Sequence, residues 1–471
     1  MKLTRGQLLG AAAAGALGVA GVYELVDHLV EAPTRHFGEG RAPEQHLLDG
    51  MRIVEDNGVE VVVPTLHHEV VTATLKLEPG SSELADARRR LELVLRELED
   101  EFVGTPEGLA VTVAWGLPYF RRFTPRQADR HLPVDRRASE LRARPVGALL
   151  PAIRFPSDAP GVVLERNHVA FLLRSDVQEN IQDGGQRIFK ALEGAVEMTS
   201  VRKGFAGGGF DGGESLPKQM AVAAGVQGAD LIPETAELFL GFTSTQQKAL
   251  GPPRIVNFET LGWVDMRDSG YFAGGTHMHV SHLFENVEAW YLDFDFTERV
   301  DTTFRPRLDV EEGTQTVPMG PKEVVGAAHV RRDFRRYGVI GHSASMQPVT
   351  RLQEDVHGSD GTLYEKGTAI PQRADFNTLD NPFFWTSQPE RDGFVDEPSP
   401  GIHFVVFNPS SDDFHRGRLA MDGVLPDGTR LPFKQGDRGQ GFNSILRTTH
   451  RQNYLVPPRR HRSFPLSELY A

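Results

Sequence analysis

The chain has 471 residues, no cysteine, 51 basic and 64 acidic residues, and a formal net charge of −13. The missing cysteines exclude disulfides, thiolate metal ligands, iron–sulfur clusters and cysteine nucleophiles. The acidic balance argues against nucleic acid as a partner, because binding to phosphates requires a basic surface. Length and composition are those of a globular protein with one large domain or two ordinary ones.

The first residues have the pattern of an export signal. Lys2 and Arg5 precede an apolar run from Leu8 to Val22, as a basic n-region precedes a short apolar h-region. This apolar run is shorter than the stretch that a membrane-spanning helix usually requires. We therefore expect residues 1–30 to direct export to the periplasm or the extracellular space. The alternative is an uncleaved segment that anchors the protein to the membrane. Residues 31–60 look like a polar linker.

The next part of the chain alternates between strand and helix patterns. Apolar and polar residues alternate from Val71 to Leu77, which predicts a half-buried strand. Apolar residues then recur at helical spacing from Leu84, behind the N-cap candidates Ser81 and Ser82. The expected elements are strand 71–77, helix 84–102, strand 109–115, strand 169–173, helix 177–192 and strand 195–198. This order is that of a ferredoxin-like unit, with helices on one face of an antiparallel sheet.

The remainder of the chain repeats the pattern less regularly. The expected elements are strand 276–282, a helix starting within 285–292, strand 402–408, a helix-like segment 442–447 and a closing strand 453–456. We therefore predict an α+β fold of two ferredoxin-like halves, 61–235 and 236–471, with antiparallel sheets. The irregular segments near 204–235 and 343–400 are too long for plain connectors and are expected to carry function or line a pocket.

Several segments carry a family resemblance in chain order. They are LAVTVAWGLPYFRRF (109–123), LLPA (149–152), RKGF (202–205), FAGGTHMHVSHLFENVEAW (272–290), GIHFVVFN (401–408) and NYLVPP (453–458). Together they resemble the DyP-type (dye-decolourising) heme peroxidases over roughly residues 60–460. No single segment is decisive, and the resemblance rests on the colinear set.

The resemblance implies a fold, a cofactor and partners. The two halves would form the DyP-type fold, which is like a dimeric α+β barrel, and the C-terminal half would carry heme b. The protein would oxidise an organic reductant with hydrogen peroxide, and a homo-oligomer is compatible with it. One alternative is a non-catalytic DyP-like protein that binds heme or another ligand and lacks the distal acid. Another is a DyP-like protein that binds no heme.

The resemblance assigns the proximal iron ligand to one of two histidines. In Val339–Pro348, His342 stands six positions before Pro348, which is the family's spacing. His329, within Ala327–Arg331, has a similar local sequence and is the second candidate. An imidazole nitrogen can ligate heme iron from one side. Without the family context, a lone histidine is more often a hydrogen-bonded loop residue.

The distal arginine of the family falls on Arg373, which lies 31 positions after His342. A fixed guanidinium beside the heme stabilises negative charge that develops on a bound peroxide. The alternative is a surface salt bridge between Arg373 and Asp375 or Glu365.

The distal acid has two candidate positions. The family carries an aspartate in G-x-x-D-G, and Asp211 matches this pattern literally, but it lies 63 residues before Gly274. The family's spacing is about thirty, and Ser244, after Phe239–Phe242, fits it. We favour Ser244, which makes Asp211 a turn residue in a glycine-rich loop. A serine is a poor base, so heme binding is expected more than ordinary peroxidase turnover.

The motif H-x-H-x-x-H at His277, His279 and His282 is a further candidate metal site. In a strand, His277 and His279 share one face and His282 points to the other. We therefore favour a polar strand face over a metal site.

Overall fold

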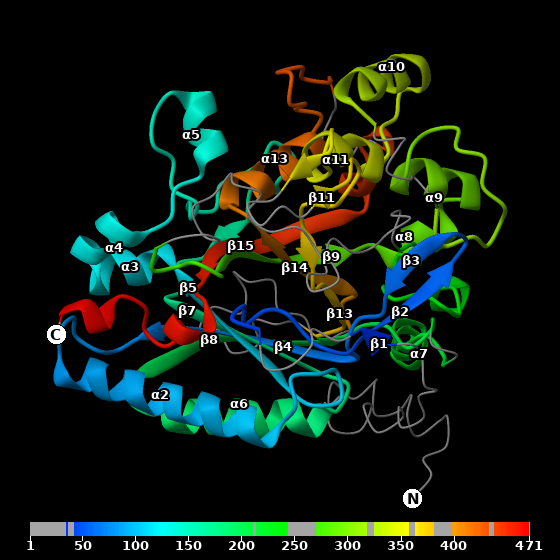
Figure 1. Ribbon diagram of the computed structural model, residues 1–471. Helices are drawn as coiled ribbons and strands as arrows, with labels where there is room; N and C mark the ends of the chain where they lie inside the picture. The colour runs from blue at the N-terminus through cyan, green and yellow to red at the C-terminus, as the bar shows by residue number, and fades with distance from the viewer. Residues whose placement is uncertain are drawn as a thin grey trace, which may run out of the picture.

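The strands lie between two layers of helices. The computed structural model describes residues 34–35, 42–210, 213–243, 270–317, 325–357, 363–380, 398–432 and 438–470. Figure 1 shows α2 (Ser82–Glu101) and α6 (Gln178–Ala191) along one side of the strands. Helices α11 (His342–Thr350) and α13 (Ser411–Met421) lie on the opposite side.

The first unit has ferredoxin-like topology. Its strands are β4 (His67–Leu75), β5 (Ala110–Gly116), β7 (Val169–Ser175) and β8 (Val196–Phe205). They pair antiparallel in the order β8-β4-β7-β5. Helix α2 connects β4 to β5, and α6 connects β7 to β8. The predicted order of elements is confirmed.

Helix α2 shows how the sequence specifies this unit. The Ser81 side chain accepts a hydrogen bond from the Leu84 amide, which caps the first turn. The side chains on one face of the helix are buried, namely Leu84, Ala87, Leu91, Val94, Leu95 and Leu98. They join the hydrophobic cluster between α2, α6 and the sheet. The apolar stripe thus fixes which face of α2 meets the strands.

The second unit repeats the topology. Its strands are β9 (Thr276–Glu285), β13 (Phe376–Thr378), β14 (Gly401–Asn408) and β15 (Leu446–Val456), in the order β13-β14-β9-β15. All of these neighbours are antiparallel, and β12 (Gln372–Arg373) also pairs with β14. Helix α13 connects β14 to β15. The α+β fold with two ferredoxin-like halves is therefore confirmed.

The two units close into one barrel-like sheet. On one side β5 pairs with β15 at Gly116–Tyr454 and Trp115–Leu455, and on the other β8 meets β13 at Phe205–Asn377. The interior is filled by Val70, Ala114, Ala170, Leu172, Ala206, Met278, Val280, Ala374, Phe376, Val405, Phe407, Tyr454 and Val456. This is the barrel-like arrangement that the resemblance implied.

Closure explains why β4 differs from its predicted half-buried state. Nearly every residue of β4 is buried, because one face meets the helices and the other faces the barrel interior. Thr72, expected on a wet face, is fully buried. Its hydroxyl forms hydrogen bonds of 2.7 Å with the hydroxyls of Thr199 and Ser200.

The structure also differs from the expected linker at 31–60. Strands β2 (Met51–Asp56) and β3 (Val59–Val62) form a hairpin there. Asn57 and Gly58 make its turn with φ values of 48° and 72°, as hairpins with an Asn-Gly turn require. The Asn-Gly pair was therefore a readable hairpin signal.

The helix-like segment expected at 442–447 is wrong in part. A 3-10 segment, η5 (Arg438–Ser444), covers only its first three residues, and β15 begins at Leu446, seven residues earlier than the predicted closing strand. The added residues of β15 are mostly polar, from Arg447 to Gln452. They are nonetheless strand residues because they pair with β9.

The remaining elements connect the strands. They are β1 (Thr34–Arg35), α3 (Leu117–Phe123), α4 (Pro125–His131), α5 (Arg136–Arg142), β6 (Val163–Leu164), α7 (Leu216–Ala223), η3 (Ala229–Leu231), α8 (Val287–Leu292), α9 (Phe296–Thr303), α10 (Ala327–Tyr337), β10 (Val356–His357), β11 (Leu363–Tyr364), η6 (Arg459–His461) and η7 (Ser467–Tyr470). The segments near 204–235 and 343–400, expected to be irregular, thus contain helices and short strands.

The predicted export signal at residues 1–30 lies outside the described residues. Within the part of the chain that the structure describes, none of the helices combines the length and the apolar character that a membrane crossing requires. Export, signal cleavage and membrane anchoring therefore stay predictions.

Candidate functional site

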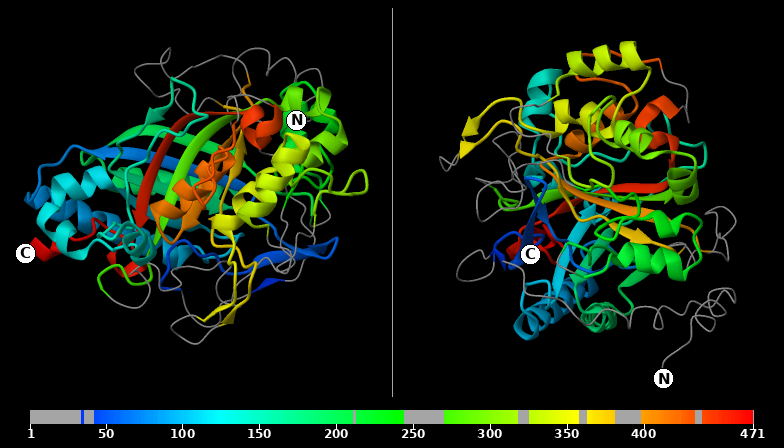
Figure 2. Two further views of the ribbon diagram at one scale, coloured as in Figure 1. Left: turned by 90° about the horizontal axis from the view of Figure 1, so that it is seen from above. Right: turned by 90° about the vertical axis from the view of Figure 1, so that its right-hand side faces the viewer.

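A cavity of about 580 Å³ lies against the outer face of the second unit. Seen from above, α11 and α13 lie across the strands of that unit (Figure 2). The helix side of the cavity is lined by residues of α11, α13 and η5, among them His342, Phe414 and Phe442. The cavity is therefore enclosed between a sheet face and two helices, a common setting for cofactor and ligand sites.

The sheet side of the wall follows from strand alternation. Ser281 of β9 is opposite Phe404 of β14, and Leu283 is opposite Ile402. Because alternate residues face the same side, these two strands present one set of side chains to the cavity and the other set to the barrel interior. The lining residues of the two strands are Ser281, Leu283, Glu285, Ile402, Phe404, Val406 and Asn408.

His342 is the first residue of α11 and lines the cavity. A side chain at the preceding Gly341 would place its Cβ 2.1 Å from the carbonyl oxygen of Phe304, so only glycine lets α11 start this close to the end of α9. The imidazole packs against Phe442, with ring centroids 4.4 Å apart. Its Nδ1 atom is buried without a hydrogen-bond partner among the described residues.

The electrostatic surroundings keep His342 neutral. Burial, with the positive charges of Arg373 and Arg418, lowers its pKa to about 3. The imidazole therefore retains a free lone pair at neutral pH, as a metal ligand must. The second candidate, His329, is exposed on α10 and is not among the residues that line the cavity.

Arg373 of β12 lines the same cavity as His342. Its side chain is 52% exposed, and Nη1 lies 3.7 Å from Oδ2 of Asp375. The salt bridge with Asp375 that was the alternative to a role beside the heme is thus present, but it is long and leaves the guanidinium at the cavity wall. The position is compatible with both functions.

Neither candidate for the distal acid can be located. Asp211 and Ser244 both lie outside the described residues. Thr243, which directly precedes Ser244 in the chain, lines the cavity.

Besides Asp413, three acidic side chains line the cavity, namely Glu237, Glu285 and Asp375. The sequence indicated only Asp375 among them, as a salt-bridge partner of Arg373. Burial raises the pKa of Asp375 to about 7, against the opposing charge of Arg373 and a hydrogen bond from the Val405 amide. Burial and the neighbouring Asp375 raise the pKa of Glu285 to about 8. Burial raises the pKa of Glu237 to about 7, although Thr243 and Arg373 oppose it. In the sequence each acid stands alone beside an apolar segment, a weak signal shared with many solvated charges.

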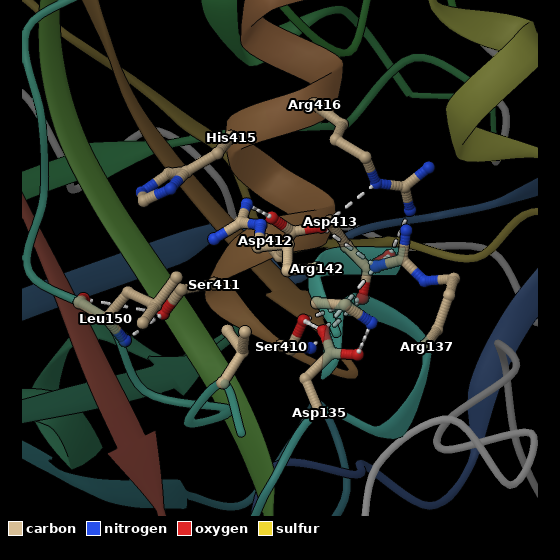
Figure 3. Close-up of polar contacts among 12 residues, drawn as sticks. Asp135, Arg137, Arg142, Leu150, Ser410, Ser411, Asp412, Asp413, His415 and Arg416 are labelled. Atoms are coloured by element: carbon tan, nitrogen blue, oxygen red, sulfur yellow. Dashed lines mark hydrogen bonds and ion pairs between the residues drawn. The ribbon is translucent and has the colours of Figure 1, made fainter. Parts of the chain in front are cut away.

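An ion-pair network borders the cavity on the α13 side. Figure 3 shows Arg137 and Arg142 of α5 reaching Asp412 and Asp413 of α13, with Arg416 on the same aspartates. Asp413 also lines the cavity. The network holds α5 against the helix that covers the site.

The three histidines of β9 divide between the two faces as predicted. The ring of His279 stacks on Phe414 of α13 at 3.4 Å, whereas His282 lies 5.0 Å from the ring of His403 on β14. His279 also shares a hydrogen bond of 2.7 Å with the side chain of Asn453. Over the described ranges, no three His, Asp or Glu side chains gather as a metal site.

Comparisons with known proteins give one family and a set of similar shapes. The model of a family of unknown function, DUF7405, matches residues 65–458. No curated protein matches the chain.

Among solved structures, the chain is similar to a Shewanella oneidensis protein assigned as a DyP-type peroxidase, with TM-score 0.48 and 13% identity over 86% of this chain and 95% of that one. The encapsulated DyP-type peroxidase of Mycobacterium smegmatis gives 0.47 and 12% over 86% and 96%. A DypB variant of Rhodococcus jostii RHA1 in complex with heme gives 0.47 and 13% over 85% and 96%.

Proposed function

The chain belongs to DUF7405, a family of unknown function, and we propose that it binds heme b in the cavity through His342. We propose further that it oxidises an organic reductant with hydrogen peroxide. The observation that carries the proposal is that His342 and Arg373, on separate elements 31 positions apart, line one cavity. The sequence resemblance assigns these two residues to opposite sides of a heme, His342 as the proximal ligand and Arg373 as the distal arginine.

The chemistry of the lining fits a heme. The walls include the apolar side chains of Leu283, Phe404 and Phe442, which suit a flat apolar ring system. The His342 imidazole lines the cavity and is neutral at pH 7, which is the state that a metal ligand requires. The lining arginines include Arg351 and Arg447, and arginine suits carboxylates such as the heme propionates.

The heme would supply the redox chemistry with peroxide, and the protein's residues would set its conditions. Neutral His342 offers a lone pair, because burial and nearby cations keep its pKa low. Arg373 provides a fixed positive charge for a peroxide that loses a proton. The apolar walls limit the water that would otherwise weaken these electrostatic effects.

A second candidate is a DyP-like protein that binds heme or another ligand without catalysis. It is favoured by the replacement of the family's aspartate by Ser244 in the better-fitting alignment, since one positioned proton-transfer group is worth about 10²–10⁴-fold in rate.

Two measurements on the purified full-length protein test these candidates. A Soret band after heme addition, saturating at one heme per chain, is expected from both heme-binding candidates, and its absence contradicts them. Peroxide-dependent oxidation of an organic dye by the heme-loaded protein is expected only from the peroxidase. Heme binding without dye oxidation favours the second candidate.

A further inference from the structure

Glu237 lines the cavity, and one of its carboxyl oxygens has no hydrogen-bond partner among the described residues. The residue lines the cavity, and its Oε2 accepts a hydrogen bond from the hydroxyl of Thr243. The other oxygen, Oε1, is buried and has no hydrogen-bond partner among the described residues. A buried oxygen in this state costs free energy, and a ligand in the cavity is one way to satisfy it.

Three hydrogen bonds from β13 and α8 hold the backbone that follows Glu237. The Asn377 side chain of β13 accepts a hydrogen bond from the Phe239 amide at 2.9 Å. The Tyr291 hydroxyl of α8 donates to the Phe239 carbonyl at 2.7 Å, and the Trp290 indole donates to the Leu240 carbonyl at 3.0 Å. A carboxyl on such a segment has a defined position, as proton transfer in a site requires.

Glu237 interacts electrostatically with Arg373, which also acts on His342. The positive charge of Arg373 acts on the carboxyl of Glu237 and on the imidazole of His342. Asp375 lies 3.7 Å from Arg373. Glu285 is different, because the neighbouring charge that acts on it is the carboxyl of Asp375. Arg174 and Arg351 also share the wall. Glu237 is thus an acid with an unpartnered oxygen that also interacts with Arg373.

We propose that Glu237 is a catalytic residue that removes a proton from hydrogen peroxide in this cavity. The inference rests on the proposed heme function. In the step, a proton moves from one peroxide oxygen to the carboxylate of Glu237, which leaves a hydroperoxide anion and a neutral carboxylic acid. No electron moves, and Arg373 balances the charge of the anion. Glu237 would thereby supply the base that Ser244 cannot provide.

The acidity of Glu237 suits this role. Burial raises its pKa to about 7, while Thr243 and Arg373 limit the rise. A group with a pKa near the working pH is populated in both protonation states, which favours transfer in either direction.

Cyanide binding tests the inference without turnover. Hydrogen cyanide binds heme iron as the anion, so it must also lose a proton, and the Soret shift reports the rate. In the heme-loaded protein, Glu237→Gln should slow both cyanide association and the reaction with peroxide by about 10²–10⁴-fold. In the wild type, cyanide association should rise as the pH is raised through about 7, and in Glu237→Gln this rise should vanish.

One variant serves as the matched control. Glu234→Gln removes an exposed acid three positions away that pairs with Lys218. It should associate with cyanide within about threefold of the wild-type rate, well under the factor expected for a proton-transfer group. If Glu237→Gln loses heme, Glu237→Asp, which keeps the acid, should retain it and show slowed cyanide binding.

The outcomes separate this inference from the proposed function. If the wild type binds no heme, both fail. If it binds heme and Glu237→Gln, or Glu237→Asp in its place, matches Glu234→Gln in rate and pH profile, the inference about Glu237 is wrong and the heme function stands.

Discussion

Two sets of acids lie in and beside the cavity, and they differ in their partners. Asp412 contacts Arg137 at 3.2 Å, Arg142 at 2.6 Å and Arg416 at 3.3 Å (Figure 3). In the cavity, Asp375 has one arginine at 3.7 Å, and Glu237 and Glu285 each keep an oxygen without a hydrogen-bond partner in the described structure. The acids of α13 thus have several arginine partners and connect α5 to α13, whereas the cavity acids have few partners among the described residues.

The difference has an energetic side. A buried carboxyl without a partner destabilises the folded state unless it is protonated, and the pKa values of the cavity acids are raised accordingly. Functional sites often lower the stability of the folded protein in this way. The α5–α13 network contributes instead to the position of the helix that covers the cavity.

The largest expected effect comes from breaking the network. Asp412→Ala removes a carboxylate that Arg137, Arg142 and Arg416 share, and the loss of a hydrogen bond between charged groups costs about 1.5–3 kcal/mol of unfolding free energy. Glu237→Gln should cost less than about 1 kcal/mol, because it removes no ion pair and retains an acceptor for Thr243. Urea denaturation measures the loss of unfolding free energy in both variants. Glu234→Gln, which breaks the exposed ion pair with Lys218, is the control. Equal losses in the two variants would remove the distinction between the two sets of acids.

An aspartate at position 244 tests whether catalysis is limited by a missing base. Ser244→Asp should raise the peroxidase activity of the heme-loaded protein by up to about 10²-fold, the lower end for one proton-transfer group. Asp211→Asn should change little. Loss of a robust native activity in Asp211→Asn would instead support the literal G-x-x-D-G match.

The raised pKa of Glu285 predicts that stability falls with rising pH. The unfolded chain ionises this group near its ordinary value of 4.5, and the folded protein only near 8. Between these values the folded state binds more protons, so unfolding free energy should fall by up to about 1.4 kcal/mol per pH unit from this group. Glu285→Gln should flatten the dependence in urea titrations from pH 5 to 8. An unchanged slope in the variant would show that Glu285 titrates normally in the folded state.

The smallest effect is expected from removing the N-terminal residues. The side chain of Gln45 donates hydrogen bonds to the carbonyls of Val113 and Pro457, and Arg459 donates to the Ala42 carbonyl. A chain lacking residues 1–40 keeps these contacts and should match the full chain in stability and heme binding. A chain lacking residues 1–50 should be less stable.

The same segment bears on location. With a C-terminal tag, the full chain should be found outside the cytoplasm in cell fractionation, free or at the membrane, and the chain lacking residues 1–40 should stay inside. A cytoplasmic full chain contradicts the export prediction.

Local sequence patterns predicted which segments form helices and strands better than they predicted which side chains are buried. The helical spacing from Leu84 and the cap at Ser81 sufficed to predict α2, because the signal lies within one segment. The burial of Thr72 could not be predicted, since it depends on closure of the sheet through Trp115, Phe205 and other residues far along the chain.

The site shows the same limit. His342 and Arg373 were proposed from a family pattern, and the structure brings them to one cavity, while their roles stay predictions. Glu237 was missed because its burial depends on Asn377 and on α8, which lie 140 and more than 50 residues away. A charge beside the apolar run Leu238–Phe242 looks like a solvated residue when only neighbours in sequence are considered.

Heme titration of two histidine variants tests the central claim most directly. The wild type and His329→Ala should give the same Soret band and the same heme affinity, because His329 is exposed on α10. His342→Ala should lose the band, because it removes the imidazole that lines the cavity. Loss of the band in His329→Ala with retention in His342→Ala, or full heme binding by both variants, would contradict the assignment of His342 as the iron ligand.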